Sequence, residues 1–393
     1  MASLVGVLRE TFPGERRVAI TPRQCEVLRK HGLEVMLESS AGVEAGFSDD
    51  LYIARGARFE SRSEVLASAE ILPQVRCLGA NPQMGRADLK SLRPGQVLVG
   101  FGEPLTALQE ASDLAQCGVS SFALELVPRI TRAQSMDALS SMATISGYKA
   151  VLIGASLLPK MFPLLMTAAG TITPAKVFVL GAGVAGLQAI ATAKRLGAVV
   201  SAYDVRPAVK EQVESVGAKF VTLDVDSAAS QDKGGYAKAM DEAFYRRQRE
   251  LMTDVLREQD VVITTAAVPG RKSPILITSE MVDAMCPGSV IVDIAAERGG
   301  NCEATQPGET VVRNGITIAG PLNLPSTVPY HASQMLSANI TAFLKLLTPK
   351  GTLTIDTQDE IIRETLVTHQ GQVVHSRVAE LVAQLGSERT VSA

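Results

Sequence analysis

The most constraining feature of the sequence is a run of apolar residues followed at once by three closely spaced glycines. Residues 177–180 read Val-Phe-Val-Leu, and the next six positions read Gly-Ala-Gly-Val-Ala-Gly. The apolar run is typical of a strand buried in a parallel sheet. A segment rich in Ala and Leu follows the glycines and predicts a helix. The order strand, glycine turn, helix predicts one unit of a parallel α/β sheet.

Each glycine has a distinct expected role in this turn. Gly181 permits the tight turn, Gly183 lets the backbone approach a pyrophosphate, and Gly186 allows the helix to pack closely on the strand. The helix begins near Val184, and its N-terminus offers N–H groups and partial positive charge to phosphates. The pattern predicts a Rossmann-type dinucleotide site, whereas the glycines alone would also fit an ordinary glycine-rich loop.

A second predicted strand, residues 198–203, ends in Asp204. An acid at this position accepts hydrogen bonds from the adenosine 2′-hydroxyl and repels a 2′-phosphate, which predicts NAD(H) as the nucleotide. Val205 and Arg206 complete the predicted contact segment. The charge of Arg206 favours a 2′-phosphate instead, so we expect its side chain to face a backbone phosphate or the adenine edge.

Composition and charge exclude several classes of protein. The chain has 38 basic and 41 acidic residues, a net charge of −3 and no basic stripe, so we expect no nucleic-acid binding. Its five cysteines and four histidines show neither disulfide nor metal-ligand spacing, which predicts no metal and fits a reducing cytosol. The uncharged runs 161–175 and 177–193 are shorter than the ~20 residues that a membrane helix needs. We therefore expect no direct membrane insertion.

Short apolar stretches alternate with helical patterns along the whole chain, which predicts the α/β class. A long helical pattern begins near Thr131 and leads towards the glycine motif, and a second one, residues 330–347, returns to short strands near 353–355. We expect two Rossmann-like domains around a cleft. The nucleotide domain, residues 141–326, is a doubly wound parallel sheet inserted into the first domain, residues 1–140 plus 327–393. Strands of the first domain are predicted at residues 4–8, 34–38, 71–75, 97–101 and 121–126.

Several further segments carry a family resemblance. Residues 128–141 read Pro-Arg-Ile-Thr-Arg-Ala-Gln-Ser-Met-Asp-Ala-Leu-Ser-Ser, and residues 234–238 read Gly-Gly-Tyr-Ala-Lys. Together with residues 206–213, 260–270 and 289–302, they make the chain similar from end to end to the NAD(H)-binding components (alpha subunit, domain I) of proton-translocating nicotinamide nucleotide transhydrogenases. Alanine dehydrogenases share the same fold and are the main alternative.

The resemblance implies that residues 129–140 seat the nicotinamide and its carboxamide. The implied catalytic residues are Arg129, Gln134, Asp137 and Ser140. The last three recur at every third position, so on a continuous helix they would lie along one side. In the other interpretation Thr131 and Gln134 form a capping box and the remainder is a solvated helix face.

The resemblance also implies further nucleotide contacts. Gly235 and Tyr236 lie in a polar segment that closes over the nucleotide in the family, and Gln248 matches another contact position. Ala266 and Ala267 end a strand at its carboxyl edge, where ligands of doubly wound sheets bind. A solvated helical glutamine and ordinary core packing are the alternatives for Gln248 and for the two alanines.

An alanine dehydrogenase would need groups that this chain lacks. Arg17 occupies the position of its substrate-carboxylate arginine, but no histidine occurs between His31 and His331, and Arg76 stands near the place of its lysine. The expected acid of residues 293–300 appears as Glu297. Amine oxidation needs a base and a polarising cation, whereas hydride transfer between two nicotinamides needs only reacting carbons about 3–3.5 Å apart. These residues favour the transhydrogenase.

The full expectation is a homodimeric oxidoreductase component that binds NAD(H), with NADP(H) bound only on a partner component. A membrane-spanning component would conduct protons, and the chain would lie peripherally on the cytoplasmic face of the inner membrane. An amino-acid dehydrogenase of the alanine type is the alternative enzyme. A non-catalytic NAD(H)-sensing module would keep the glycine motif but would not need residues 129–140.

Overall fold

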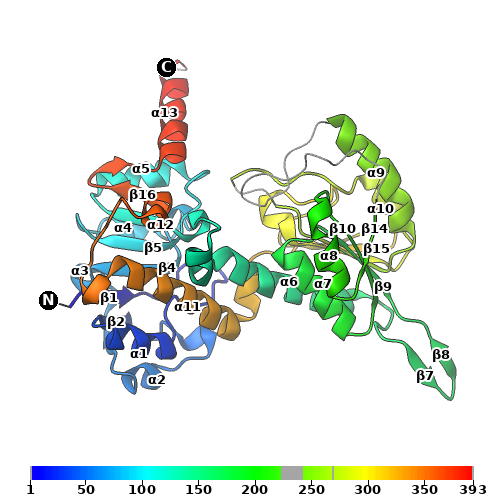
Figure 1. The fold of residues 1–393 in the computed structure, drawn as a ribbon, viewed down its shortest axis with the longest axis horizontal. Helices are drawn as coiled ribbons and strands as arrows, with labels where there is room; N and C mark the ends of the chain where they lie inside the picture. The colour runs from blue at the N-terminus through cyan, green and yellow to red at the C-terminus, as the bar shows by residue number, and fades with distance from the viewer. Residues whose placement is uncertain (1, 223–241, 268–269, 392–393) are drawn as a thin grey trace. The chain divides into compact units, whose positions relative to one another are not determined.

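The computed structural model describes residues 2–222, 242–267 and 270–391, and only the backbone of residues 242–246, 248, 249 and 386–391. The chain divides into two compact units, Met1–Met142 with Val328–Ala393, and Ala143–Thr327 (Figure 1). These limits lie one or two residues from the predicted ones, 140/141 and 326/327. The function assigned to each domain stays a prediction.

The unit Ala143–Thr327 contains a seven-stranded sheet in the order β11-β10-β9-β12-β13-β15-β14. All its strand pairs are parallel except that of β14 with β15. The chain moves outward from β9 through β10 to β11 and then returns to the other side of β9, so the strand order reverses between β9 and β12. The predicted α/β class and doubly wound sheet are confirmed, with one antiparallel edge strand. The strands are β9 (Lys176–Leu180), β10 (Val199–Tyr203), β11 (Lys219–Phe220), β12 (Val261–Thr264), β13 (Val290–Asp293), β14 (Thr310–Arg313) and β15 (Ile316–Ala319).

Strand β9 is apolar throughout its buried part because both faces of this sheet are covered. Val177 and Val179 belong to one core cluster, and Phe178 and Leu180 belong to another. Alternate residues of a strand point to opposite faces, so the two clusters lie on opposite sides of the sheet. The elements outside the sheet are α7 (Val184–Arg195), α8 (Lys210–Ser215), α9 (Glu242–Arg257), α10 (Ser279–Asp283), the 3-10 turns η5 (Pro207–Val209), η6 (Ile294–Arg298) and η7 (Leu324–Thr327), and a separate hairpin, β7 (Leu165–Thr167) and β8 (Gly170–Ile172).

The other unit contains an eight-stranded sheet in the order β17-β16-β6-β5-β4-β1-β2-β3. Strands β1 to β6 are parallel, and β16 adds antiparallel to β6. The C-terminal strands are β16 and β17, so the expectation of strands near 353–355 is wrong; that segment is an irregular connection. The strands are β1 (Leu4–Val7), β2 (Glu34–Glu38), β3 (Arg58–Glu60), β4 (Ile71–Arg76), β5 (Val97–Phe101), β6 (Ser120–Ala123), β16 (Leu366–His369) and β17 (Gln372–Val373).

Helix α11 (Pro329–Leu347) is a long, largely buried helix of this unit. Serine hydroxyl groups on it accept hydrogen bonds from backbone N–H groups of the segment that leads into α1 (Pro22–Lys30). Ser333 Oγ accepts a hydrogen bond from Val18 N at 3.0 Å, and Ser337 Oγ accepts one from Thr21 N at 2.9 Å. The remaining helices are α2 (Asp49–Ile53), α3 (Arg62–Ser68), α4 (Arg86–Leu89), α5 (Leu108–Gln116), α12 (Glu360–Thr365) and α13 (Ser376–Val391), with 3-10 turns η1 (Val43–Ala45), η2 (Leu78–Ala80), η3 (Leu124–Leu126), η4 (Thr131–Met136) and η8 (Pro349–Gly351).

The helix expected to run on from Thr131 is interrupted. The turn η4 ends at Met136, and α6 (Ala138–Leu157) begins two residues later. Asp137 separates them with a ψ angle of 83°, which is outside the helical range. Within the described ranges, no helix is both long enough and apolar enough to cross a membrane.

Gly186 should be required for the stability of the Ala143–Thr327 unit. A Cβ atom at this position would lie 1.8 Å from the carbonyl oxygen of Gly181, which belongs to the backbone and cannot rotate away. We expect Gly186→Ala to lower the free energy of unfolding by about 1–3 kcal/mol or more, as overpacking does. Thermal or urea unfolding measures this change.

Gly183→Ala is the matched control for this prediction. A Cβ atom on Gly183 would meet nothing within 4 Å, and its φ of −75° suits alanine. Its free energy of unfolding should stay within about 0.5 kcal/mol of the original. Equal stability of the two variants would contradict the close packing of α7 on β9.

Candidate functional site

The glycine turn joins β9 to α7 and leaves open space in front of the helix N-terminus. Gly181 has a φ of +96°, which favours glycine, and a Cβ atom there would lie 2.5 Å from Thr265 Oγ1. Gly183 precedes Val184, the first residue of α7, and no side chain caps this end. The first N–H groups of a helix have no partners within the helix, so an uncapped end can receive an anion.

Asp204 follows β10 and lies directly beside this turn. Its Oδ2 accepts a hydrogen bond from the backbone N of Ala182 at 2.7 Å, and the residue is 8% exposed. The sequence predicts that the turn and the acid serve the same site, and the structure brings them into contact.

The side chain of Arg206 pairs with the carboxylate of Asp204. Its Nε donates to Asp204 Oδ1 and its Nη2 to Asp204 Oδ2, both at 2.9 Å. The expectation that its side chain faces a phosphate or the adenine edge of a bound nucleotide stays a prediction. A two-residue separation lets the guanidinium fold back onto the carboxylate, and this geometry is bidentate.

The strand end that carries Ala266 is held by a buried polar network. Asn301 Oδ1 accepts from Ala266 N at 3.0 Å, and Asn301 Nδ2 donates to the carbonyl oxygens of Ala266 and Pro274 at 2.8 Å. Asp293, fully buried at the end of β13, accepts from Asn301 N at 2.7 Å and from Thr264 Oγ1 at 2.8 Å. Both side chains of this network fix the backbone at the carboxyl edge of the sheet.

Sequence reasoning did not identify Asp293 or Asn301 as important residues. Asp293 ends an apolar run and Asn301 follows two glycines with positive φ, Gly299 and Gly300. A charged residue at the end of a buried strand is rarely left without several hydrogen bonds, and this signal could have found Asp293. Thr265, which follows β12, connects this strand end to the glycine turn, because its Oγ1 donates a hydrogen bond to the Gly181 carbonyl oxygen at 3.0 Å.

The candidate catalytic residues 129–140 do not lie along one continuous helix. Gln134 belongs to η4, Asp137 is the break, and Ser140 lies in the first turn of α6. Asp137 accepts from Ser140 N at 2.9 Å and from Ser140 Oγ at 2.5 Å, so it caps α6. The expected common helix face is wrong. The capping box is wrong as well, because η4 is preceded by Ile130 and has no side-chain cap.

Buried neighbours hold the turn η4 in place. Ala133 and Met136 are buried, and Asn339 Nδ2 on α11 donates to the Ser135 carbonyl oxygen at 2.9 Å. Gln134 is exposed between them, and its side chain makes no hydrogen bond within the described residues. Arg129 is exposed as well. The turn therefore presents Gln134 on a fixed backbone.

The remaining predicted contact residues differ in what the structure says of them. Val184 is exposed at the start of α7, Val205 is half-buried between Asp204 and Arg206, and Ala267 is exposed after β12. Gly235 and Tyr236 lie outside the described residues. Gln248 lies on α9, and only its backbone is described.

Arg17, the position implied for a substrate carboxylate in alanine dehydrogenases, is buried and already paired. Its Nε and Nη2 donate to the two carboxylate oxygens of Glu15 at 2.7 and 2.6 Å, and its Nη1 lies 3.1 Å from Met142 Sδ. Arg76 Nε also contacts Glu15, at 3.3 Å.

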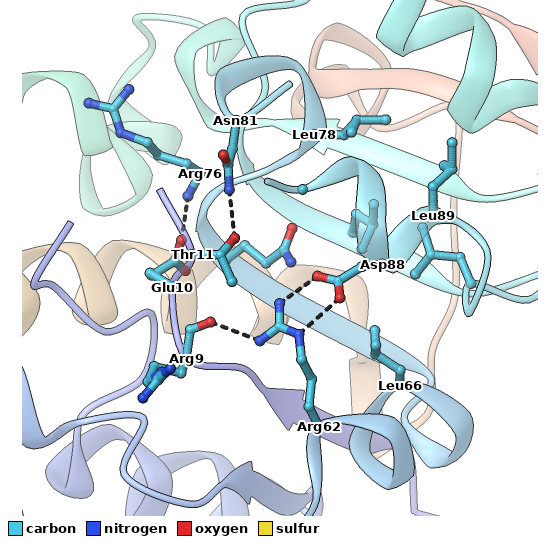
Figure 2. Close-up of a pocket in the computed structure, with 14 residues that line it drawn as sticks. Arg9, Glu10, Thr11, Arg62, Leu66, Arg76, Leu78, Asn81, Asp88 and Leu89 are labelled. Atoms are coloured by element: carbon cyan, nitrogen blue, oxygen red, sulfur yellow. Dashed lines mark hydrogen bonds and ion pairs between the residues drawn. The ribbon is translucent and has the colours of Figure 1, made fainter. Parts of the chain in front are cut away.

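A pocket of about 450 Å³, counted with its open mouth, lies at the carboxyl ends of β1 and β4. Figure 2 shows that its polar groups point at one another: Arg62 at Asp88, Asn81 at Thr11, and the backbone of Arg76 at Glu10. Strand order also reverses at this point, but the segment between β1 and α1 contains a single glycine, Gly14, in place of three closely spaced ones. Its internally paired charges make it part of the framework of this unit.

Two carboxyl groups near this sheet edge titrate unusually. Burial raises the pKa of Glu10 to about 7, against the effect of hydrogen bonds from Val75 N and Arg76 N. Burial, followed by the nearby charge of Glu103, raises the pKa of Glu125 to about 7. Glu125 Oε2 is buried without a hydrogen-bond partner in the described part of the chain, which explains the direction.

Comparison with known proteins gives the same class as the sequence. Family models described as "Alanine dehydrogenase/PNT, N-terminal domain" and "Alanine dehydrogenase/PNT, C-terminal domain" match residues 6–146 and 150–376. The chain belongs to the alanine dehydrogenase/PNT family.

Within this family the chain groups with the transhydrogenases. It is 44% identical over 375 residues to the NAD(P) transhydrogenase subunit alpha (first part) of Rhodospirillum rubrum, covering 94% of this chain and 97% of that one. The crystal structure of a transhydrogenase from Sinorhizobium meliloti superposes with a TM-score of 0.85 at 40% identity, over 95% of this chain and 100% of that one. Alanine dehydrogenase of Halomonas elongata is 29% identical over 384 residues, 96% of each chain. The prediction of a transhydrogenase alpha subunit, and not an alanine dehydrogenase, is confirmed.

The raised pKa of Glu125 predicts that stability falls as pH rises from about 5 to about 7. Over this range the unfolded chain releases a proton that the folded chain retains, so the free energy of unfolding decreases. Glu125→Gln removes this titration and should be more stable than the original at pH 8 by about 1–3 kcal/mol. Urea unfolding at pH 5 to 8 measures the effect.

Glu44→Gln, a change of an exposed glutamate, is the control and should leave the pH profile unchanged. Part of the slope should persist in Glu125→Gln because Glu10 titrates in the same range. A Glu125→Gln profile as steep as the original, with no gain at pH 8, would contradict a carboxyl group that is neutral when buried.

Proposed function

We propose that this chain binds NAD(H) at the glycine turn of the Ala143–Thr327 unit and holds its nicotinamide for direct hydride transfer. The observation that supports this proposal most is the turn itself. Gly183 leaves open space before an uncapped helix N-terminus, and the carboxylate of Asp204 is anchored to Ala182 beside it. A pyrophosphate suits the first feature and an adenosine ribose suits the second.

The second nucleotide, NADP(H), binds only on a partner component in this proposal. A membrane-spanning component conducts the protons, and the chain acts as a homodimer on the cytoplasmic face of the inner membrane. The support is the similarity to proteins named NAD(P) transhydrogenase subunit alpha, together with one glycine fingerprint in the chain.

Hydride transfer between two nicotinamides requires no acid or base from the protein. The C4 hydrogen of the reduced ring moves with its electron pair to C4 of the oxidised ring, so one ring is oxidised and the other reduced without release of a proton. Catalysis then consists of orienting the two carbons. Residues 129–140 serve this purpose: Gln134 contacts the nicotinamide end with Arg129, while Asp137 and Ser140 fix the join between η4 and α6.

Nucleotide titration of the purified chain tests the site directly. NADH should bind at least about tenfold more tightly than NADPH, because hydrogen bonds to a charged group contribute about 1.5–3 kcal/mol. Gly183→Ala should keep its fold but weaken NADH binding about tenfold or more, since the added methyl group would occupy the space of the pyrophosphate. Equal binding of the two nucleotides by the original chain would refute the assignment.

Gln134→Asn separates binding from transfer. The dissociation constant for NADH should stay within about tenfold, because one neutral hydrogen bond contributes only ~0.5–1.5 kcal/mol. Single-turnover transfer to NADP⁺ on the partner component should fall about a hundredfold, because a small misplacement of the reacting carbon is enough for such a loss. Stopped-flow absorbance on the reconstituted complex measures both quantities.

Ser135→Ala is the matched control, since Ser135 is the exposed neighbour of Gln134 and is held through its carbonyl oxygen. It should transfer hydride at nearly the original rate. Transfer by Gln134→Asn that is as fast as that of this control would show that Gln134 has no part in the reaction.

A further inference from the structure

The carboxylate of Asp204 is fully occupied in the structure. Oδ1 accepts from Arg206 N and Arg206 Nε, each at 2.9 Å, and Oδ2 accepts from Ala182 N at 2.7 Å and Arg206 Nη2 at 2.9 Å. A carboxylate offers about four acceptor sites. No site therefore remains for the hydroxyl groups of a ribose while all four bonds persist.

Only two of these four bonds can be exchanged without moving the backbone. The N–H groups of Ala182 and Arg206 belong to the glycine turn and to the segment after β10, whereas Nε and Nη2 sit on a flexible side chain. The two exchangeable bonds reach one carboxylate oxygen each. An adenosine ribose presents two neighbouring hydroxyl donors, so it can replace the two guanidinium donors one for one.

We propose that Arg206 acts as a placeholder on Asp204, that the two ribose hydroxyls of NADH displace its guanidinium, and that this exchange makes Arg206 a determinant of nucleotide specificity. The inference rests on the NAD(H) site proposed above. It assigns Arg206 a role that its charge alone would not suggest, since a free arginine at this position favours a 2′-phosphate.

The exchange works against NADPH for two reasons. NADPH has only the 3′-hydroxyl to offer Asp204, and its 2′-phosphate is repelled by the carboxylate. The guanidinium that could bind this phosphate is held by Asp204, with side-chain exposures of 12% for Arg206 and 5% for Asp204. The ion pair thus competes with a 2′-phosphate for the guanidinium, and Arg206 can bind the phosphate only when it leaves Asp204.

Four forms of the full chain test the proposal: the original, Asp204→Asn, Arg206→Met, and the double variant. NADH and NADPH affinities are measured by nucleotide fluorescence, and association rates by stopped flow. Asp204→Asn should bind NADPH at least about tenfold more tightly than the original, because it releases the guanidinium. The double variant should keep only the smaller part of this gain, which comes from removing the repulsion between the carboxylate and the 2′-phosphate. Arg206→Met alone should bind NADPH within about twofold of the original.

Arg206→Met alone should also bind NADH with an association rate raised about threefold or more, since no guanidinium has to leave. This association rate tests the placeholder role of Arg206 even if Asp204→Asn does not fold. A gain in NADPH affinity that is equal with and without Arg206, or an unchanged NADH association rate in Arg206→Met, would overturn the placeholder. A lack of NADH binding by the original chain would overturn the proposed function instead.

Discussion

The close approach of α7 to the end of β9 is the constraint on which the Ala143–Thr327 unit depends. It exists because a side chain is missing at Gly186, where a Cβ atom would lie 1.8 Å from the Gly181 carbonyl oxygen. The same approach brings Ala182 N within 2.7 Å of Asp204 Oδ2 and lets Thr265 bond to the Gly181 carbonyl. Three parallel strands, β10, β9 and β12, are therefore joined at their carboxyl ends through the glycine turn. These contacts restrict the backbone at the place where a nucleotide is proposed to bind.

Rigidity at this sheet edge extends through Asp293 and Asn301. Neither is proposed to touch a ligand, yet together they fix the backbone of Ala266 by hydrogen bonds in a fully buried setting. In the other unit, η4 is held in a comparable way by Ala133, Met136 and the bond from Asn339. Both units thus present small or exposed residues on backbones that buried neighbours hold. This arrangement suits a reaction in which orientation contributes more than proton transfer.

The parts of this structure that follow from local pattern could be predicted from the sequence. The strand, glycine turn and helix at residues 176–195 are local, as is the acid that ends β10, and the α/β order of the chain follows from alternating patterns. The predictions that were wrong concern elements whose structure depends on contacts that the sequence does not display. Asp137 interrupts a helical pattern because its carboxylate accepts hydrogen bonds from the N–H and hydroxyl of Ser140. The ion pair between Arg206 and Asp204 is likewise a contact that the sequence does not display. Strand β16 forms where β6 offers a partner and β17 pairs with β16, whereas the apolar residues near 353–355 form no strand.

The central claim is that this chain serves hydride transfer by position alone, without a group that exchanges protons with the reacting carbon. A single turnover with NADH deuterated at the transferred C4 position, carried out in ordinary water on the complex with the NADP(H)-binding component, tests it most directly. The account predicts that all of the transferred deuterium appears at C4 of NADPH and none in the solvent. Loss of deuterium to water during the turnover would contradict it.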